Sequence, residues 1–457
     1  MVDIKEIAKS FVGRRAARFI GSRLPYRLAV LDRHFFAWLE LLHAMERMSR
    51  EEIVDYQTKT FLHILKRAYY ETDFYREKYD KAGLDISKIK GLDDLGAIPL
   101  LTKAELRQHG ARLVVKGKSP TRLARAATGG STGTPLQLSV PRYAISRDWA
   151  SICYQWARAG YRPGDGRVEF RGAVPGGNVL EALGPERVIR VNTSRINEVT
   201  LPRILAVIRA SGYRYYHGYP SAVSEWCRLL RVAGERPDPP FAIFMASEMV
   251  YPHQLEQMRQ VFPESYLFAH YGLAERVALG AWWGEGQRYH FLPAYGVVEA
   301  EESTGRLIGT SLLQDEVPLI RYLTDDATAA LVGGRPDSPP YLFPVAEGID
   351  GRLADYTYRV DGTLVAPALV TYPFMSGSTI AACKLVQRER STIELLVEAN
   401  PDAMGLAAEI ERAITNLKAL YGEDMRFETT MVDSLERSAS GKFRWIECYI
   451  DDGRDDA

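Results

Sequence analysis

The chain of 457 residues has only four cysteines, and no two of them form a Cys-x-x-Cys pair. Cys153, Cys227, Cys383 and Cys448 are scattered along the sequence. This spacing excludes a zinc ribbon and does not support a disulfide scaffold. We therefore expect reduced and mostly buried thiols.

Long apolar runs and an excess of one charge are also absent. No stretch reaches the roughly 18 apolar residues of a membrane span, and the N-terminus lacks the apolar core of a secretory signal, so we expect a cytoplasmic protein. The 58 basic residues balance the 58 acidic ones. Because no overall positive field would attract a polyanion, no nucleic-acid partner is expected.

One segment departs from this balance, since the first 27 residues are rich in basic side chains set among apolar ones. A solvated helix with a basic face explains the pattern, and the same pattern would allow weak association with an anionic membrane surface. The sequence leaves the oligomeric state open, with a homodimer as one expectation. The basic residues are Lys5, Lys9, Arg14, Arg15, Arg18, Arg23 and Arg27.

The periodicity of apolar residues predicts an α/β protein with a second, smaller unit. Helical spacing over 35–81 predicts a helical entry region, and alternating helices and short strands over 143–299 are typical of a layered α/β sheet. We expect a helical region 1–95 packed on the large domain, an α/β domain 96–350, a hinge 351–355 and a mobile α+β domain 356–457. Expected helices cover 144–159, 201–210 and 406–421, and expected strands 214–217, 242–245, 266–269, 379–387, 393–398 and 425–432.

A glycine-rich run from Thr128 to Pro135 is the clearest clue to chemistry, with three glycines and four hydroxyl side chains in eight residues. Glycines let the backbone approach a ligand closely, and successive amides and hydroxyls can then cradle phosphate oxygens. No Gly-Lys-Ser or Gly-Lys-Thr follows, so the run is not a P-loop. An exposed hairpin turn is the other interpretation of the run taken alone. The segment Thr102-Lys103-Ala104-Glu105 before it predicts a helix capped by Thr102, and the run itself is expected to join two strands.

Five segments follow one another in a characteristic order: 128–135, Tyr271-Gly272-Leu273-Ala274-Glu275, Arg321-Tyr322-Leu323-Thr324-Asp325-Asp326, Gly351-Arg352-Leu353-Ala354-Asp355 and Ser438-Ala439-Ser440-Gly441-Lys442. Together they resemble the adenylate-forming superfamily of acyl-CoA synthetases, adenylation domains and luciferases.

A second set of segments narrows the resemblance: Phe74-Tyr75-Arg76, Ile98-Pro99-Leu100-Leu101-Thr102-Lys103, His217-Gly218-Tyr219-Pro220-Ser221, Ser247-Glu248 and Asp361-Gly362. These resemble the phenylacetate-CoA ligase branch, in particular the CapK-like members associated with capsular polysaccharide biosynthesis.

The resemblance implies ATP-dependent adenylation of a carboxylic acid, with release of pyrophosphate and transfer of the acyl group to coenzyme A. Tyr271 would stack on adenine, Gly272 would also belong to the ATP-binding residues, Asp326 would contact the ribose, and Arg352 the ribose or a phosphate. Glu275 would hold Mg²⁺, and Lys442 would be the catalytic cation that meets the carboxylate and the α-phosphate. The loop residues expected to bind ATP are Thr128, Gly129, Gly130, Ser131, Thr132, Gly133 and Thr134.

Four positions depart from the family pattern. Leu136 replaces the usual loop lysine, Ala274 a threonine, Asp325 a glycine, and Ala354 the acidic or basic residue of the hinge. These departures keep an inactive nucleotide-binding homologue open as an alternative. Another alternative is a CapK-like enzyme that passes its acyl group to a sugar, amine or carrier. For Asp325 and Asp326, the alternative to nucleotide contact is a turn that caps a strand.

The sequence does not name the acid. Aromatic and apolar side chains near the expected cleft would fit an aryl or medium acyl group, although each of them is individually typical of a protein core. The alternative to an aryl or medium acyl group is a polar or anionic substrate, which Arg276 would meet. The candidate wall residues are Trp156, Tyr216, Tyr219, Phe244, Met245, Trp282 and Trp283.

Overall fold

The structure is a computed structural model of the 457-residue chain. It describes residues 26, 31–118, 123–127, 136–171, 174, 178–282, 288–328, 330–332, 344–346, 348–349, 351–352, 356–365, 379–399, 404–436 and 443–450. The basic N-terminal side chains, the glycine-rich run 128–135, Ala354 and Lys442 lie outside these residues. Expectations that concern them, including surface association and the domain boundaries, remain predictions.

The N-terminal region is helical, as its periodicity predicts. Helices α4 (Arg33–Met45), α5 (Arg50–Glu71) and α6 (Asp73–Lys81) follow one another with short breaks. Each start is fixed locally, because a side chain accepts a hydrogen bond from an otherwise unpaired amide of the first turn. Ser49, for example, caps α5 in a capping box with Glu52.

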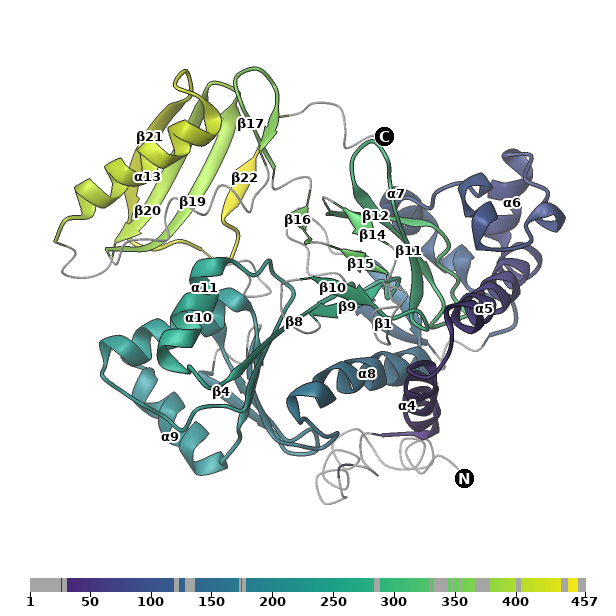
Figure 1. Ribbon diagram of the computed structural model, residues 1–457, viewed down its shortest axis with the longest axis horizontal. Coiled ribbons are helices and arrows are strands. Elements are labelled where there is room, and N and C mark those ends of the chain that lie inside the picture. Colours follow the sequence, from purple (N-terminus) through teal and green to yellow (C-terminus); the bar gives the residue numbers. More distant parts are fainter. Residues whose placement is uncertain are drawn as a thin grey trace.

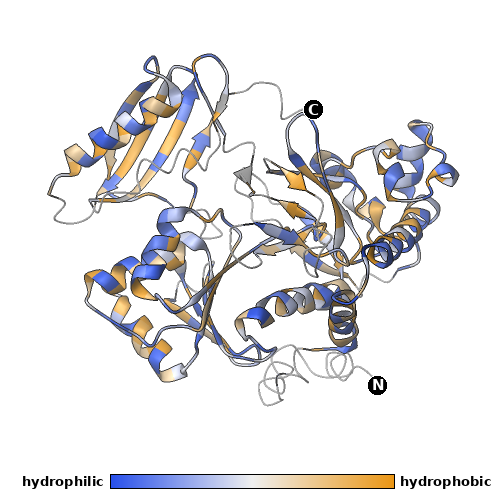
Figure 2. Cartoon of the chain, in the orientation of Figure 1, coloured by the Kyte–Doolittle hydropathy of each residue, from blue (hydrophilic) through white to orange (hydrophobic). Residues whose placement is uncertain are grey.

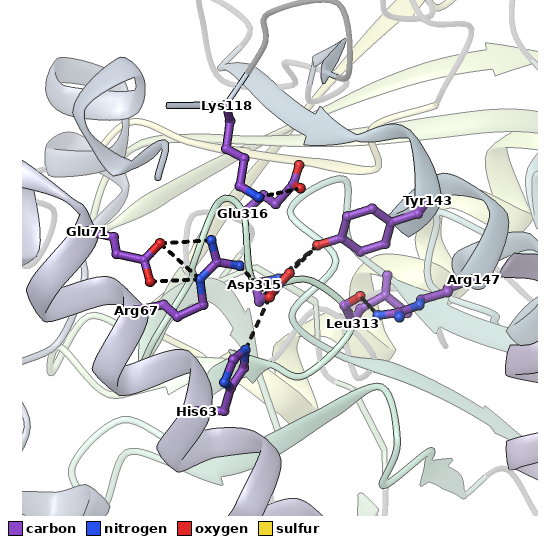
Figure 3. A network of polar contacts seen from close by, with 9 residues as sticks. All are labelled: His63, Arg67, Glu71, Lys118, Tyr143, Arg147, Leu313, Asp315 and Glu316. Carbon is purple, nitrogen blue, oxygen red and sulfur yellow. Dashed lines mark hydrogen bonds and ion pairs between the residues drawn. The ribbon is translucent and has the colours of Figure 1, made fainter. Parts of the chain in front are cut away.

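A partly buried carboxylate, Asp315, fastens these helices to the rest of the large domain (Figure 3). Asp315 accepts hydrogen bonds from Arg67 of α5 at 2.5 Å and from Tyr143 at 2.6 Å, and it lies 3.2 Å from His63. Burial opposes ionisation of Asp315, but the hydrogen bonds from Tyr143 and Arg67 outweigh it and lower its pKa to about 2. Arg67 also contacts Glu71, so the charges form a network.

Helix α7 (Lys103–His109) leads into a hairpin of strands β1 (Leu123–Ala127) and β2 (Gln137–Pro141). Thr102 and Glu105 form the capping box at the start of α7, as the sequence predicts. The two strands pair antiparallel, so the glycine-rich run joins two strands, which confirms its expected place in the fold.

A ten-stranded sheet forms the centre of the described part of the large domain, in the order β14-β15-β10-β9-β8-β7-β6-β3-β5-β4. Its middle strands β3, β6, β7 and β8 are parallel neighbours. The bounds are β3 (Arg167–Phe170), β4 (Leu180–Leu183), β5 (Val188–Val191), β6 (Tyr215–Gly218), β7 (Ala242–Ala246), β8 (Tyr266–Gly272), β9 (Leu279–Trp282), β10 (Tyr289–Phe291), β14 (Leu331–Val332) and β15 (Val345–Ala346).

Helices cover both faces of this sheet (Figure 1). Helix α8 (Arg142–Trp156) packs on one face, where it shares a core with Phe244 and Phe268. Helices α9 (Leu201–Ser211), α10 (Pro220–Val232) and α11 (Pro252–Val261) cover the other face. Successive strand residues therefore enter different cores, because side chains alternate along a strand.

A smaller antiparallel sheet, β11-β12-β13-β16, lies beside the central sheet. Its strands are β11 (Gly296–Ala300), β12 (Arg306–Ser311), β13 (Tyr322–Ala327) and β16 (Gly351–Arg352). Leu101, just before α7, forms a parallel bridge to Tyr322. The segment around Leu101 is thereby brought against β13.

The C-terminal part has a sheet and a hydrophobic core of its own, in the order β21-β20-β19-β22. Figure 2 shows apolar stretches on β19 and β20 and alternating polar and apolar residues along the covering helix α13. A mixed α/β fold with a separate small α+β unit is thus confirmed. The bounds are β17 (Thr357–Tyr358), β18 (Leu364–Val365), β19 (Ile380–Glu389), β20 (Thr392–Ala399), α13 (Leu406–Tyr421), β21 (Arg426–Val432) and β22 (Ile446–Cys448).

Two further expectations concern cysteines and membranes. All four cysteines are free thiols, and three of them are buried. None of the helices within the described ranges combines the length and apolarity that crossing a bilayer would require.

Candidate active site

The side chains of Tyr271 and Asp326 meet where β8 and β13 approach each other. The hydroxyl of Tyr271 donates a hydrogen bond of 2.7 Å to Asp326 Oδ2. Burial raises the pKa of Tyr271, and the neighbouring Asp326 carboxylate raises it further. Two segments 55 residues apart in the sequence therefore form one polar site.

Glu275 extends this site with a buried carboxylate that is 6% exposed. Tyr322 of β13 donates a hydrogen bond of 2.9 Å to Glu275 Oε1. Burial raises the pKa of Glu275, and the charge of Asp326 adds to the shift. Such a carboxylate is easier to ionise when a cation binds beside it. No cluster of three or more His, Cys, Asp or Glu side chains within the described residues is arranged to hold a metal.

Asp325 has a structural partner that accounts for its departure from the family pattern. Its carboxylate forms an ion pair with Lys103, the first residue of α7, and it lies 3.9 Å from Arg306. Asp325 and Asp326 both lie within β13. The alternative that they cap a strand as a turn is therefore wrong, and the two side chains serve separate contacts.

For two more of the expected site residues, Gly272 and Arg352, the structure gives the position of the backbone. Gly272 ends β8 and is exposed, directly after Tyr271. Arg352 lies in β16 opposite Asp326 in the antiparallel register. The segment 351–352 thus borders the site, and the side chain of Arg352 lies outside the described part.

The residues around the glycine-rich run are described although the run itself is not. Leu136, the first described residue after it, is 1% exposed and belongs to the core under α8. The apolar side chain at this position is therefore used in packing, which a lysine could not do without burying its charge.

Strained backbone conformations mark the same segments. Four non-glycine residues in the described part have positive φ, and three of them lie in or next to the motifs: Ser247 at 70°, Arg276 at 58° and Arg321 at 47°. Such conformations cost about 1–3 kcal/mol each and cluster at binding and catalytic sites. Their distribution supports a functional site at these loops.

Arg276 is already engaged by the protein. Its guanidinium contacts Asp148 of α8 at 3.1 Å and donates to the carbonyl of Ala274 at 2.9 Å. Tyr295 donates a second hydrogen bond to Asp148. The expectation that Arg276 meets an anionic substrate is not supported, because Asp148 neutralises its charge.

The aromatic and apolar residues expected near the acid cleft are divided between two cores on opposite faces of the central sheet. Trp156 and Phe244 stack at 4.2 Å in the core under α8, whereas Tyr216 and Met245 lie in the core under α9–α11. These four residues therefore do not form a single surface, because neighbouring positions on a strand face opposite sides of the sheet. Tyr219 and Trp282 belong to the second core, and Trp283 lies outside the described residues.

The small domain docks on the large one through the segment that follows Lys442. The backbone amide of Phe443 donates a hydrogen bond of 3.1 Å to Glu248 Oε1. Trp445 packs against Tyr251 and His253 at ring-centroid distances of 5.8 and 5.4 Å. The Ser247-Glu248 segment thus contacts the residues that directly follow the predicted catalytic lysine in the sequence.

A wide cleft of about 1620 Å³ separates α10 and α11 from the small domain. Its lining is rich in charged side chains of both signs and includes Phe443 and Trp445. Tyr271, Glu275 and Asp326 do not line it. The cleft is therefore a space between the domains, separate from the Tyr271–Asp326 site.

Sequence reasoning did not single out Tyr322 or the Lys103–Asp325 ion pair. Tyr322 and Asp326 lie on the same face of β13 by the two-residue period of a strand, which is a signal the sequence does contain. The ion pair joins residues 222 positions apart, and no local pattern indicates it.

Comparison with known proteins gives sequence relatives but no match to any protein-family model. A phenylacetate-coenzyme A ligase from Thermus thermophilus is 26% identical over 314 residues, which cover 62% of this chain and 67% of the relative. A phenylacetate-coenzyme A ligase from Aromatoleum evansii is 23% identical over 454 residues, covering 89% and 96%.

Solved structures share the fold over most of the chain. A 2-hydroxyisobutyryl-CoA ligase in its postadenylation state, with 2-HIB-AMP bound, has a TM-score of 0.67 at 20% identity and covers 90% of this chain and 92% of its own. The same ligase in its thioesterification state, with 2-HIB-AMP and CoA, has a TM-score of 0.54 at 20% identity, covering 88% and 91%. The chain has the fold of these ligases.

Proposed function

We propose that this chain, a homologue of the phenylacetate-coenzyme A ligases with the adenylate-forming fold, activates a carboxylic acid as acyl-AMP and transfers the acyl group to coenzyme A. The observation that carries the proposal is the meeting of Tyr271, Glu275 and Asp326 in one site. Tyr271 and Glu275 come from one motif and Asp326 from another, and each is of the chemical type that the reaction needs at that place.

The nucleoside would bind across β8 and β13. The Asp326 carboxylate can accept hydrogen bonds from the two ribose hydroxyls, and the ring of Tyr271 offers a flat surface for adenine. Tyr271 holds Asp326 in place through their hydrogen bond. Arg352, opposite Asp326 in the sheet, would approach the ribose or a phosphate from the other side.

The phosphates would lie between Glu275 and the loop 128–134. Glu275, Asp325 and Asp326 bring three carboxylates close to Tyr322. ATP adds more negative charge, so the site requires a cation. Glu275 is a suitable oxygen ligand for Mg²⁺, which keeps few protein ligands and binds phosphate oxygens. Mg²⁺ would there neutralise the phosphate charge.

In the first half-reaction a carboxylate oxygen of the acid attacks the α-phosphorus of ATP. The bond from that phosphorus to the bridging oxygen breaks, and pyrophosphate leaves with the electron pair. Lys442 would meet the negative charge that builds up on the transferring group, since an ammonium placed there stabilises the transition state more than the bound substrate. The docking of Phe443 on Glu248 supports this placement of the neighbouring lysine.

In the second half-reaction the thiol of coenzyme A gives up its proton and attacks the acyl carbon, and AMP leaves. The small domain would rotate about the 351–355 hinge between the two steps. A CapK-like transfer to a sugar, amine or carrier differs only in this step. An inactive nucleotide-binding homologue would perform neither step.

Exchange of labelled pyrophosphate into ATP, scanned over a panel of carboxylic acids, tests the first step. Acid-dependent exchange is expected, followed by thioester formation when coenzyme A is added. Exchange without consumption of coenzyme A would instead favour the alternative acceptors. ATP binding without exchange for any acid would favour the inactive homologue.

A further inference from the structure

Two histidines and one tryptophan form a buried polar cluster between α8 and the central sheet. Trp156 of α8 contacts His217 of β6 at 4.9 Å and His270 of β8 at 6.0 Å between ring centroids. The two imidazoles lie 5.9 Å apart. All three side chains are at most 9% exposed. We call Trp156, His217 and His270 the Trp-His-His cluster.

Four polar atoms of this cluster are buried without a hydrogen-bond partner. They are the indole Nε1 of Trp156, both ring nitrogens of His217, and Nδ1 of His270. Leaving such a group unpaired costs about 1–3 kcal/mol, and native proteins contain few of them. Their concentration on three touching rings indicates a missing partner.

The carboxylate nearest to the cluster is occupied elsewhere. Glu169 of β3 receives hydrogen bonds of 2.9 and 3.1 Å from Arg167. His217 Nδ1 lies 3.8 Å from Glu169 Oε1, which is too long for a hydrogen bond. Burial lowers the pKa of His217 to about 4 and outweighs the opposing effect of the nearby Glu169 carboxylate. Burial also lowers the pKa of His270, and the charge of Arg171 lowers the pKa of both imidazoles further. Both imidazoles are therefore neutral near pH 7.

Because both imidazoles are neutral, only some chemical groups can be the missing hydrogen-bond partner of the cluster. Each neutral ring presents one donor and one acceptor, and the indole presents a donor. A hydroxyl group also donates one hydrogen bond and accepts others, so it matches this set. An apolar group would leave the four atoms unpaired. A metal ion does not suit the site, because no metal-binding group of side chains occurs within the described residues.

The position of the cluster fits the acyl part of the substrate. His270 and Tyr271 are neighbours near the carboxyl end of β8, and their side chains face opposite sides of the sheet, His270 toward Trp156 and Tyr271 toward the core under α9–α11. His217 lies at the carboxyl end of β6, next to Glu169 of β3 in the parallel register. Ligands of open α/β sheets bind at these strand ends. The stacked pair Trp156–Phe244 supplies apolar surface beside the polar atoms.

We propose that the Trp-His-His cluster makes this enzyme select carboxylic acids that carry a hydroxyl group on the acyl part. The proposal rests on the proposed adenylation activity and names its substrate class. Sites built to hydrogen-bond a substrate hydroxyl reject the analogue that lacks it, because the buried polar groups are then left unpaired.

The test compares acids in matched pairs that differ by one hydroxyl. Suitable pairs are phenylacetate with para-hydroxyphenylacetate, benzoate with para-hydroxybenzoate, and isobutyrate with its alpha-hydroxy derivative. For at least one pair we expect kcat/KM in pyrophosphate exchange to favour the hydroxylated acid by about 100-fold or more. Calorimetric titration of the same pairs in the presence of AMP measures the preference without turnover.

Substitutions within the Trp-His-His cluster test whether these residues cause the preference for hydroxylated acids. Trp156→Phe removes the indole donor and keeps an aromatic ring, and His270→Phe removes the imidazole nitrogens. Each is expected to reduce the preference about tenfold or more, mainly by weakening the hydroxylated acid. Trp226→Phe is the matched control, because Trp226 is equally buried with an unpaired indole nitrogen but belongs to the core on the opposite face of the sheet.

The outcomes separate the two proposals. Exchange with an unsubstituted acid that equals or exceeds its hydroxylated partner in every pair would leave adenylation standing and overturn the hydroxyl preference. An equal loss of preference in Trp226→Phe and Trp156→Phe would also overturn it. Absence of exchange with any acid would count against adenylation, and the calorimetric preference would then decide the cluster's role by itself.

Discussion

The hydroxyl of Tyr271 and the carboxylate of Asp326 are joined by a 2.7 Å hydrogen bond between the central sheet and the smaller sheet. The bond orients the carboxylate toward the junction of the two sheets, where Glu275 and Tyr322 also meet. A site preorganised in this way holds a ligand without first having to order its own side chains.

Tyr271→Phe should weaken ATP binding while keeping the fold. The ring remains for adenine, but Asp326 loses a donor to its charged oxygen, which is worth about 1.5–3 kcal/mol. We expect the KM for ATP to rise about tenfold or more, with a smaller change in kcat. Tyr289→Phe, at the edge of the Tyr271 ring, is a control that should leave the KM for ATP unchanged.

Glu275→Gln should reduce kcat about 100-fold and raise the Mg²⁺ concentration needed for half-maximal exchange. The amide keeps the hydrogen bond from Tyr322 and the volume of the side chain, so the fold should survive. Tyr322→Phe keeps the carboxylate and should affect the Mg²⁺ requirement much less. An unaltered Mg²⁺ requirement in Glu275→Gln would remove this residue from metal binding.

Asp315→Asn should destabilise the large domain by about 2 kcal/mol in urea unfolding at pH 7. The change leaves Arg67 without one of its two carboxylate partners. Removing one partner of a fully buried ion pair destabilises a protein by roughly 3–5 kcal/mol, and this pair is partly exposed, so its loss should cost less. Glu71→Gln removes the other, more exposed partner of Arg67 and should cost less than half as much. Equal effects would contradict a hub role for Asp315.

The stability of the chain should fall as the pH decreases from about 6.5 to about 4, partly because of His217. Burial lowers its pKa in the folded protein to about 4 from an ordinary value of 6.5. The unfolded chain therefore takes up a proton in this window while the folded chain does not, and stability rises with pH. The difference amounts to about 3 kcal/mol at the acid end.

Urea unfolding of the unmodified chain and of His217→Phe, each at pH 7.5 and pH 5, measures this contribution. The variant should show a shallower dependence on pH, whatever its stability at neutral pH. The same slope in both proteins would show that His217 does not carry the effect.

Local patterns predicted the fold to the extent that secondary structure depends on neighbouring residues. The predicted helix 406–421 coincides with α13, and Thr102 with Glu105 forms the predicted cap. The order of motifs indicated that the segments around Tyr271 and Asp326 belong to one site, and the structure brings them together.

Contacts between elements that are far apart in the chain could not be predicted from local sequence patterns. Lys103 with Asp325, and Arg67 with Asp315, join residues 222 and 248 positions apart, and such pairs depend on how whole elements pack. The division of the expected wall residues between two cores is different, because the alternation of side chains along β6 and β7 is a local pattern that already separates Tyr216 from Phe244. Lys442 and the loop 128–134 lie outside the described residues, so their roles stay predictions.

Acid-dependent exchange of pyrophosphate into ATP, measured for the unmodified chain and for Lys442→Ala, tests the central proposal most directly. We expect exchange with at least one acid, and a loss of about 100-fold or more in the variant while ATP still binds. Lys418→Ala, on the helix of the same domain, is the control and should retain exchange. Exchange that is equally fast in Lys442→Ala would contradict the proposed mechanism, and ATP binding without exchange for any acid would contradict adenylation itself.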